Sequence, residues 1–316
     1  MAEGPEIDSG PNVPPMTDRR PSPAPGHPSD PRAQSTWEVT MASTEHGILV
    51  GYDGSSSSHQ ALSWAAREAR ERGLGLTLCH TWLPGSAGPP LAGETEDLAR
   101  ESAQRILATG IRSAYAPDVQ KLLLEGPAAR VLCEQSEAAD LVVVGSRGLG
   151  GLSGLMLGSV SLQVAAFATA PVVVVRGHWR PVGDYRPGHI VVGADGSAGT
   201  DAALAFGGQE AALRGVPLTV VCALSDAPGS LGMAHHIEDE VERSIIRWEK
   251  DHPDIAIHRQ ITLESPRAAL LAAAQEAQLL VVGSRGRGGM QGMTLGSVTQ
   301  ALLWHAPCPL AVIHAR

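Results

Sequence analysis

The segment ILVGYDGS at residues 48–55 returns as IVVGADGS at residues 190–197, which is 142 positions later. A second run, LVVVGSRG at 141–148, returns as LLVVGSRG at 279–286 with an offset of 138. Because the order is kept and the two offsets differ by only four residues, the sequence predicts two copies of one domain of roughly 130 residues.

Within each copy, short apolar runs alternate with longer stretches of helical periodicity, which is the βαβ pattern of a parallel sheet with helices on both faces. The sequence therefore predicts an α/β fold made of two tandem, doubly wound domains, each with a five-stranded parallel sheet. The strands are expected at 47–52, 76–82, 119–124, 140–144 and 171–175, and again at 189–194, 217–223, 255–262, 279–282 and 309–314.

The helix that follows the first strand of each copy is predicted from small apolar residues at helical spacing. They are Ala61, Leu62, Ala65, Ala66 and Ala69 in the first copy, and Ala202, Ala203, Ala205, Ala211 and Leu213 in the second.

Four segments follow from this pattern. Residues 1–44 are rich in Pro, Ser, Gly and Asp, so we expect a disordered tail. The first domain is expected at 45–176, a linker rich in glycine and proline at 177–188, and the second domain at 189–316.

Composition narrows the function classes. A formal net charge of -9 argues against nucleic-acid or anionic-membrane partners, which need a basic surface. The four cysteines form no C-x-x-C pair and are expected to be reduced core residues. No signal peptide or membrane-spanning stretch is evident, so a cytoplasmic location is predicted.

The strongest constellation follows the fourth strand of each copy. Gly145-x2-Gly148 is followed, after nine residues, by Gly158-Ser159, and Gly283-x2-Gly286 is followed at the same spacing by Gly296-Ser297. Glycines let a backbone approach a bulky anion, and a helix that begins at Gly158 or Gly296 would point free N–H groups at it. The simpler alternative is that the serines are N-caps and the glycines fit tight turns. A Walker A loop is excluded because no lysine lies in either loop.

Asp53 and Asp195 end the first strands, so they should project into the same crevice as the glycine loops. A carboxylate there could accept hydrogen bonds from a ribose or from an adenine amino group. The alternative, which is compatible with the first, is that Asp-Gly-Ser caps the following helix.

A first strand ending in Asp and a G-x2-G-x9-G-[ST] loop after the fourth strand resemble the nucleotide-binding branch of the universal stress protein family, over residues 47–316. The resemblance implies strand order 3-2-1-4-5 and ATP at the strand ends. It implies that Asp53, Asp195, Gly51 and Gly193 lie at the adenine, which the backbones of Thr81 and Ala223 also meet. It further implies that Gly145 and Gly283 approach the ribose, and that the phosphates are cradled by Gly148, Gly158, Ser159 and Val160 and by Gly286, Gly296, Ser297 and Val298.

The function expected from these features is an ATP-binding regulatory or stress-response protein with two sites, at most slow hydrolysis and no catalytic or metal-ligating residue. Mg²⁺ with the ATP is left open. The alternatives are an adenine-nucleotide hydrolase or adenylate-transferring enzyme, and a nucleotide-free dimerisation scaffold. The apolar last strands, 172–175 and 310–313, are expected to pair with each other inside the chain or between two chains of a homodimer.

Overall fold

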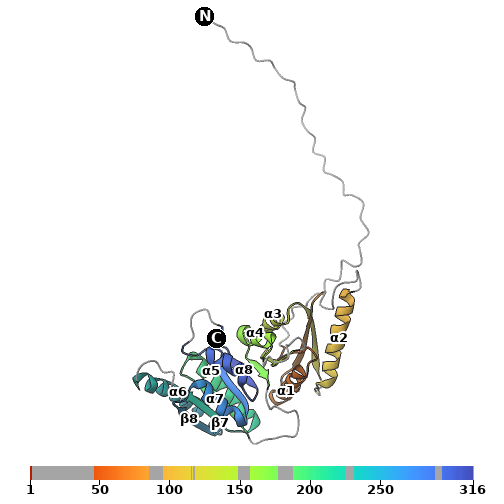
Figure 1. Ribbon diagram of the computed structural model, residues 1–316. Coiled ribbons are helices and arrows are strands. Elements are labelled where there is room, and N and C mark those ends of the chain that lie inside the picture. Colours follow the sequence, from red (N-terminus) through yellow and green to blue (C-terminus); the bar gives the residue numbers. More distant parts are fainter. Residues whose placement is uncertain are drawn as a thin grey trace. The chain divides into compact units, whose positions relative to one another are not determined.

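A computed structural model describes Met1 and residues 46–84, 95–114, 116, 118–148, 157–176, 188–224, 231–288 and 294–315. Residues Ser43–Arg316 belong to one compact unit (Figure 1). The tail expected at 1–44 and the linker expected at 177–188 lie outside the described residues, apart from Met1 and Gly188, and both remain predictions.

In the described part of the chain, ten strands form one continuous sheet in the order β3-β2-β1-β4-β5-β10-β9-β6-β7-β8. Counted from its own first strand, each half has the order 3-2-1-4-5 with parallel pairing throughout, as the resemblance implied. The strands are β1 (Ile48–Gly51), β2 (Leu76–Trp82), β3 (Val119–Glu125), β4 (Leu141–Gly145), β5 (Val172–Val175), β6 (His189–Ala194), β7 (Leu218–Ala223), β8 (Ile257–Thr262), β9 (Ala277–Gly283) and β10 (Leu310–Ile313).

The two halves meet where β5 pairs with β10, and this pair is antiparallel. Val173 lies opposite Ala311, and both residues are fully buried. The expected pairing of the two last strands within the chain is confirmed. Since β5 and β10 cover each other, the outer strands of the sheet are β3 and β8. A homodimer remains a prediction.

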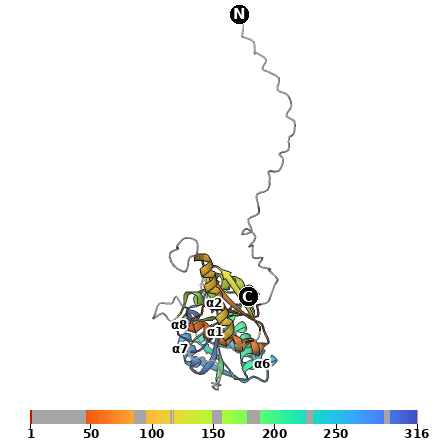
Figure 2. The same cartoon turned by 90° about the vertical axis from the view of Figure 1, so that its right-hand side faces the viewer.

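Helices cover both faces of the sheet (Figures 1 and 2). One core cluster joins the sheet to α1, α2, α5 and α6, and a second joins the opposite face to α3, α4, α7 and α8. The helices are α1 (Ser56–Arg72), α2 (Thr95–Ser113), α3 (Ala128–Gln135), α4 (Ser159–Phe167), α5 (Ala198–Arg214), α6 (Leu231–Asp251), α7 (Pro266–Ala273) and α8 (Ser297–His305), with 3-10 turns at Ser136–Ala138 and Ala274–Glu276.

The central strands are apolar on both faces because helices cover both. Ile48 and Val50 face one core cluster, whereas Leu49 faces the other. Each fully buried Leu, Ile or Val side chain contributes roughly 1.5–3 kcal/mol to stability. These alternating contacts anchor β1 and β4, whose carboxyl ends carry the candidate site.

Helix α1 has local signals at both ends. The Ser55 side chain accepts a hydrogen bond from the Ser58 N–H at 3.1 Å, and Gly73 ends the helix with φ +66°. All five apolar residues expected to form the α1 stripe are buried. In α5, by contrast, Ala205 and Leu213 are exposed, and Leu204 and Phe206 are buried in their place, so the apolar stripe lies on a different part of the helix than the sequence suggested.

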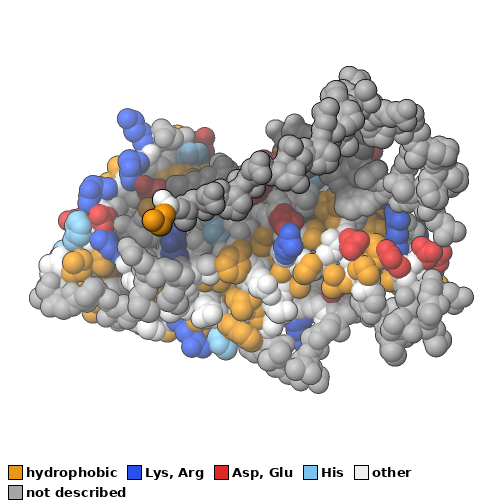
Figure 3. Space-filling view, turned by 90° about the horizontal axis from the view of Figure 1, so that it is seen from above, with side chains coloured by type: hydrophobic (Ala, Val, Ile, Leu, Met, Phe, Trp, Pro, Cys, Tyr) orange, Lys and Arg blue, Asp and Glu red, His pale blue; other side chains and the backbone are white. Residues whose placement is uncertain are grey.

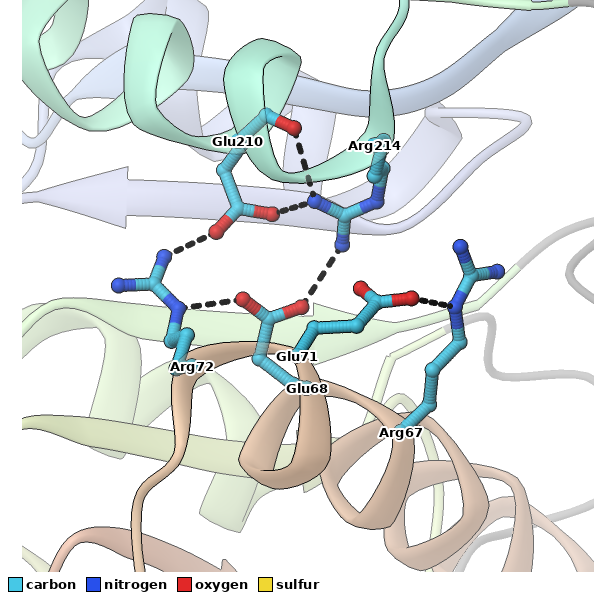
Figure 4. Close-up of polar contacts among 6 residues, drawn as sticks. All are labelled: Arg67, Glu68, Glu71, Arg72, Glu210 and Arg214. Carbon is cyan, nitrogen blue, oxygen red and sulfur yellow. Dashed lines mark hydrogen bonds and ion pairs between the residues drawn. The ribbon is translucent and has the colours of Figure 1, made fainter.

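Four charged side chains cross-link α1 and α5 beneath the β5–β10 pair (Figure 4). Arg214 donates to Glu68 at 2.8 Å, and Arg72 donates to Glu210 across the same boundary. Each arginine also pairs with the glutamate four residues before it on its own helix. The four residues Glu68, Arg72, Glu210 and Arg214, called the α1–α5 quartet below, thus form a closed ring in which each half contributes one Glu and one Arg.

Candidate functional site

The candidate site of each half lies at the carboxyl ends of two neighbouring strands. In the first half, β1 ends at Gly51 and β4 ends at Gly145, and these strands pair in parallel. Asp53 therefore lies beside the glycine loop, and a Cβ placed on Gly148 would collide with its carboxylate. In the second half, Gly286 approaches Asp195 in the same way. The structure thus brings together the carboxylate and the glycine loop that the sequence singled out separately.

The two ends of the first glycine loop are held by backbone hydrogen bonds. Ser146 N–H donates to the Val175 carbonyl at 3.1 Å, and Gly158 N–H donates to the Ser146 carbonyl at 2.7 Å. The second loop has the same bonds, from Ser284 to Ile313 and from Gly296 to Ser284. Residues 149–156 and 289–293, which complete the loops, lie outside the described residues.

Helices α4 and α8 begin at these loops. Their N-caps are Gly158 and Gly296, and neither has a side-chain cap. Ser159 and Ser297 are the exposed first residues of the helices, so the alternative that these serines are N-caps is wrong. The N–H groups of a first helical turn have no partner within the helix. They carry a partial positive charge at the site, which favours an anion.

Asp195 is held by donors from its own surroundings. Its Oδ1 accepts from Ser197 N–H at 3.0 Å and from Thr200 Oγ1 at 3.3 Å, while its Oδ2 accepts from Arg287 N–H at 2.9 Å. Asp53 Oδ1 likewise accepts from Ser55 N–H at 2.9 Å. The turn after each first strand is therefore stabilised by its aspartate. The helix cap that the sequence left open is made in the first half by Ser55, whereas Ser197 makes no side-chain cap bond in the second. A carboxylate has about four acceptor positions, so the three bonds to Asp195 leave capacity for a ligand there.

Several predicted glycines have a packing role. A Cβ on Gly51 would lie 2.8 Å from Leu132, and a Cβ on Gly193 would lie 3.1 Å from Leu270. A Cβ on Gly145 would lie 2.6 Å from the Ser57 backbone of α1. These close approaches give a reason for glycine that does not involve a ligand, so glycine at these three positions does not by itself identify a binding residue.

The other predicted contacts lie around the same strand ends. Thr81 is half-buried in β2 and follows His80, whose Nδ1 lies 2.6 Å from the Tyr52 carbonyl. Burial lowers the pKa of His80, although this hydrogen bond opposes the shift. His80 thereby ties β2 to the residue before Asp53. Ala223 ends β7 in the second half, and Gly283 ends β9. Val160 and Val298 are half-buried at the starts of α4 and α8.

The sequence profile of the universal stress protein family matches residues 46–176 and, a second time, residues 187–314. The chain belongs to the universal stress protein family. It is 36% identical to a universal stress protein of Mycolicibacterium smegmatis over 296 residues, which cover 88% of this chain and 100% of that one. It is 34% identical to a universal stress protein of Mycobacterium tuberculosis over 313 residues, which cover 87% of this chain and 96% of that one.

Solved structures show the same fold. A universal stress protein from Archaeoglobus fulgidus has a TM-score of 0.67 at 20% identity, covering 86% of this chain and 100% of its own. A universal stress protein described as putative, from Pseudomonas aeruginosa, has a TM-score of 0.58 at 18% identity, covering 86% of this chain and 94% of its own. These likenesses confirm the tandem α/β architecture.

In this universal stress protein, sequence reasoning missed one side chain at the second site. Arg287 follows Gly286, and its guanidinium pairs with Glu240 of α6. The signal available in the sequence was the difference between Leu149 and Arg287 after two otherwise identical GSRG segments. Two further arginines, Arg147 and Arg285, lie inside the repeated GSRG segments and are exposed.

The cysteines of this universal stress protein lie in the two core clusters or pack against them. Cys79, Cys222 and Cys308 are buried, and Cys133 is half-buried. Burial raises the pKa of Cys79 to about 12, which keeps its thiol neutral. The described cysteines are all unpaired, as the sequence indicated.

Neither a membrane-spanning helix nor a metal-binding cluster is found among the described residues. None of the helices has the length and apolar character needed to cross a membrane. His, Cys, Asp and Glu side chains nowhere gather in a group that could hold a metal ion.

On the face drawn in Figure 3, acidic and basic side chains are interspersed.

Proposed function

We propose that this universal stress protein binds ATP at two homologous sites and holds it without rapid turnover, as a regulatory module of the stress response. The proposal rests on one observation, made twice. An uncapped helix begins at Gly158 or Gly296, beside a glycine loop whose backbone touches the aspartate at the end of the neighbouring strand. This arrangement supplies N–H donors for phosphates at one end and a carboxylate for the adenosine at the other.

The assignment of ligand parts follows the same geometry. Phosphates would lie over the starts of α4 and α8, against Gly148 and Gly286. Adenosine would lie toward Asp53 and Asp195. The family membership supports this arrangement, since the resemblance from which it was taken covers both halves.

Binding without rapid turnover is the more specific part of the proposal. Phosphoryl transfer needs an in-line nucleophile, a residue to orient it, and cations at the transferring phosphate. Among the described residues of the two loops, the charged side chains are Arg147, Arg285 and Arg287. The carboxylates, Asp53 and Asp195, are assigned to the adenosine end, so neither is placed as a catalytic base.

The test is calorimetric titration of ATP, with and without Mg²⁺, into the full-length protein and into the variants Gly158→Glu, Gly296→Glu and their combination. A Cβ at either glycine would have its nearest neighbours at 3.5 Å or more, so a side chain can start there without displacing the backbone. The glutamate would fill the phosphate position and repel the ligand. Each single variant should lose one site, and the double variant should lose both.

Gly158→Ala is the matched control, because it adds a methyl group at the same place without a charge and should retain its site. The double variant binding ATP as tightly as the unchanged protein would refute the site assignment. Mass spectrometry of the nucleotide released from freshly purified protein would identify the ligand directly.

A further inference from the structure

An ion pair lies over the turn that carries Asp195 in the second half. The Arg287 guanidinium pairs with the Glu240 carboxylate of α6 and donates to the Asp195 backbone carbonyl at 3.3 Å. The Arg287 N–H also donates to Asp195 Oδ2. A Cβ built on Gly196 would lie 2.7 Å from Arg287 Nη1 and 2.9 Å from Glu240 Oε2. The pair therefore rests directly on the turn after β6, at the edge of the proposed site.

Arg287 is one residue from Gly286, which the proposed function places at the phosphates. A planar guanidinium suits phosphate oxygens because it can donate two parallel hydrogen bonds. The first half has Leu149 at this position, directly after Gly148. Both halves have an arginine before this glycine, Arg147 and Arg285, but an arginine directly after it is a property of the second site alone.

The bond between Arg287 and Glu240 is of the kind that an anion can replace. Both side chains are partly exposed, at 30% and 28%, and exposed ion pairs are weak. The hydrogen bond from Arg287 lowers the pKa of Glu240, so the carboxylate is charged at neutral pH. The other titratable groups facing Glu240 are His236, whose Nε2 is 3.4 Å from Oε1, and Arg243.

We propose that Glu240 pairs with Arg287 when the second site is empty, and that a nucleotide phosphate takes the place of Glu240 on the Arg287 guanidinium. Arg287 then selects polyphosphate nucleotides at this site only. The inference rests on the proposed function. It makes the two homologous sites unequal, because in the first half Leu149 can offer the phosphates no charge.

The test measures the second site alone, in full-length protein carrying Gly158→Glu, by calorimetric titration with ATP and with adenosine. Glu240→Gln removes the competitor, so ATP should bind about two- to fivefold more tightly. Arg287→Leu reproduces the first copy and should weaken ATP binding roughly tenfold or more. Adenosine affinity should stay the same in both variants, since adenosine has no phosphate.

Asp239→Asn is the matched control. Asp239 is exposed on the same helix. Its substitution removes the same charge as Glu240→Gln but leaves the pair between Glu240 and Arg287 in place. Because exposed charges are screened, the ATP affinity should stay within twofold. A purely structural ion pair would make Glu240→Gln and Arg287→Leu change ATP affinity in the same direction, which would overturn the inference. Equal changes for ATP and adenosine would overturn it too.

The two proposals fail in different ways. If the unsubstituted protein binds no ATP, the proposed function fails and this inference falls with it. If two sites bind ATP but neither substitution changes the second, only the inference fails. If the Gly158→Glu parent binds nothing and neither substitution restores binding, the second half holds no nucleotide site and the inference is wrong.

Discussion

Arg214 of the second half donates to Glu68 of the first half at 2.8 Å, across the boundary between α1 and α5. Glu68 is 1% exposed and Glu210 is fully buried, so the α1–α5 quartet lies inside the protein. Arg72 of α1 lies over the Phe206 ring of α5, and Arg214 of α5 lies over the Trp64 ring of α1, so each half places an arginine on an aromatic ring of the other. The quartet thus ties the halves together at a second place besides β5 and β10.

Breaking the quartet should destabilise the protein strongly. Removing one partner of a buried ion pair leaves an uncompensated charge and costs about 3–5 kcal/mol. We expect Glu210→Ala to lower the free energy of unfolding by that order, as measured by urea denaturation. Glu134→Ala is the control, because its pair with Arg130 on α3 is exposed and lies outside the quartet, so it should contribute about 0–1 kcal/mol. Equal losses in the two variants would contradict the role given to the quartet.

The quartet also predicts a pH dependence of stability. Burial and the nearby Glu210 carboxylate raise the pKa of Glu68 from its ordinary 4.5 to about 7, while Arg214 and Arg72 oppose the shift. The native state therefore binds the Glu68 proton more tightly than the unfolded state does. The stability linked to this proton is present below pH 4.5 and is lost as the pH rises through about 7.

Thermal unfolding at pH 6 and pH 8 checks this sign. The melting temperature of the unchanged protein should be lower at pH 8 than at pH 6, by about 2–4 °C for each kcal/mol of stability lost. Glu68→Gln keeps the neutral side chain at both pH values, so its melting temperature should fall less. A parallel fall in the variant would assign the pH effect to other groups.

The pairing of β5 with β10 predicts the effect of a charge at the sheet centre. Val173 and Ala311 are opposite each other and fully buried, so Val173→Asp places an unpaired carboxylate there. We expect a loss of roughly 3–5 kcal/mol in unfolding free energy and a larger radius of gyration by small-angle scattering. Lys121→Asp on the exposed side of β3 is the control and should change neither quantity.

The central strands were predictable because apolar, β-branched runs buried on both faces leave a signature in the sequence itself. The approach of Asp53 to Gly148 was also predictable, since it follows from the order of parallel strands. The quartet was not, because Glu68-x3-Arg72 and Glu210-x3-Arg214 look like ordinary exposed pairs on two helices. Only the pairing of β5 with β10 brings α1 and α5 together and buries them. The bridge from Arg287 to Glu240 depends in the same way on where α6 packs.

The last prediction concerns ATP turnover. Ground-state binding by backbone amides stabilises substrate and transition state about equally, which gives affinity without rate. An uncapped helix and glycines lie at the proposed phosphate position, whereas both aspartates are held in turns by backbone N–H groups. We therefore expect phosphate release from Mg-ATP well below about 1 per second, the low end for ordinary enzymes. The Gly158→Glu, Gly296→Glu double variant controls for contaminating ATPases. Release at or above that rate, abolished in the double variant, would instead establish an ATP-hydrolysing enzyme.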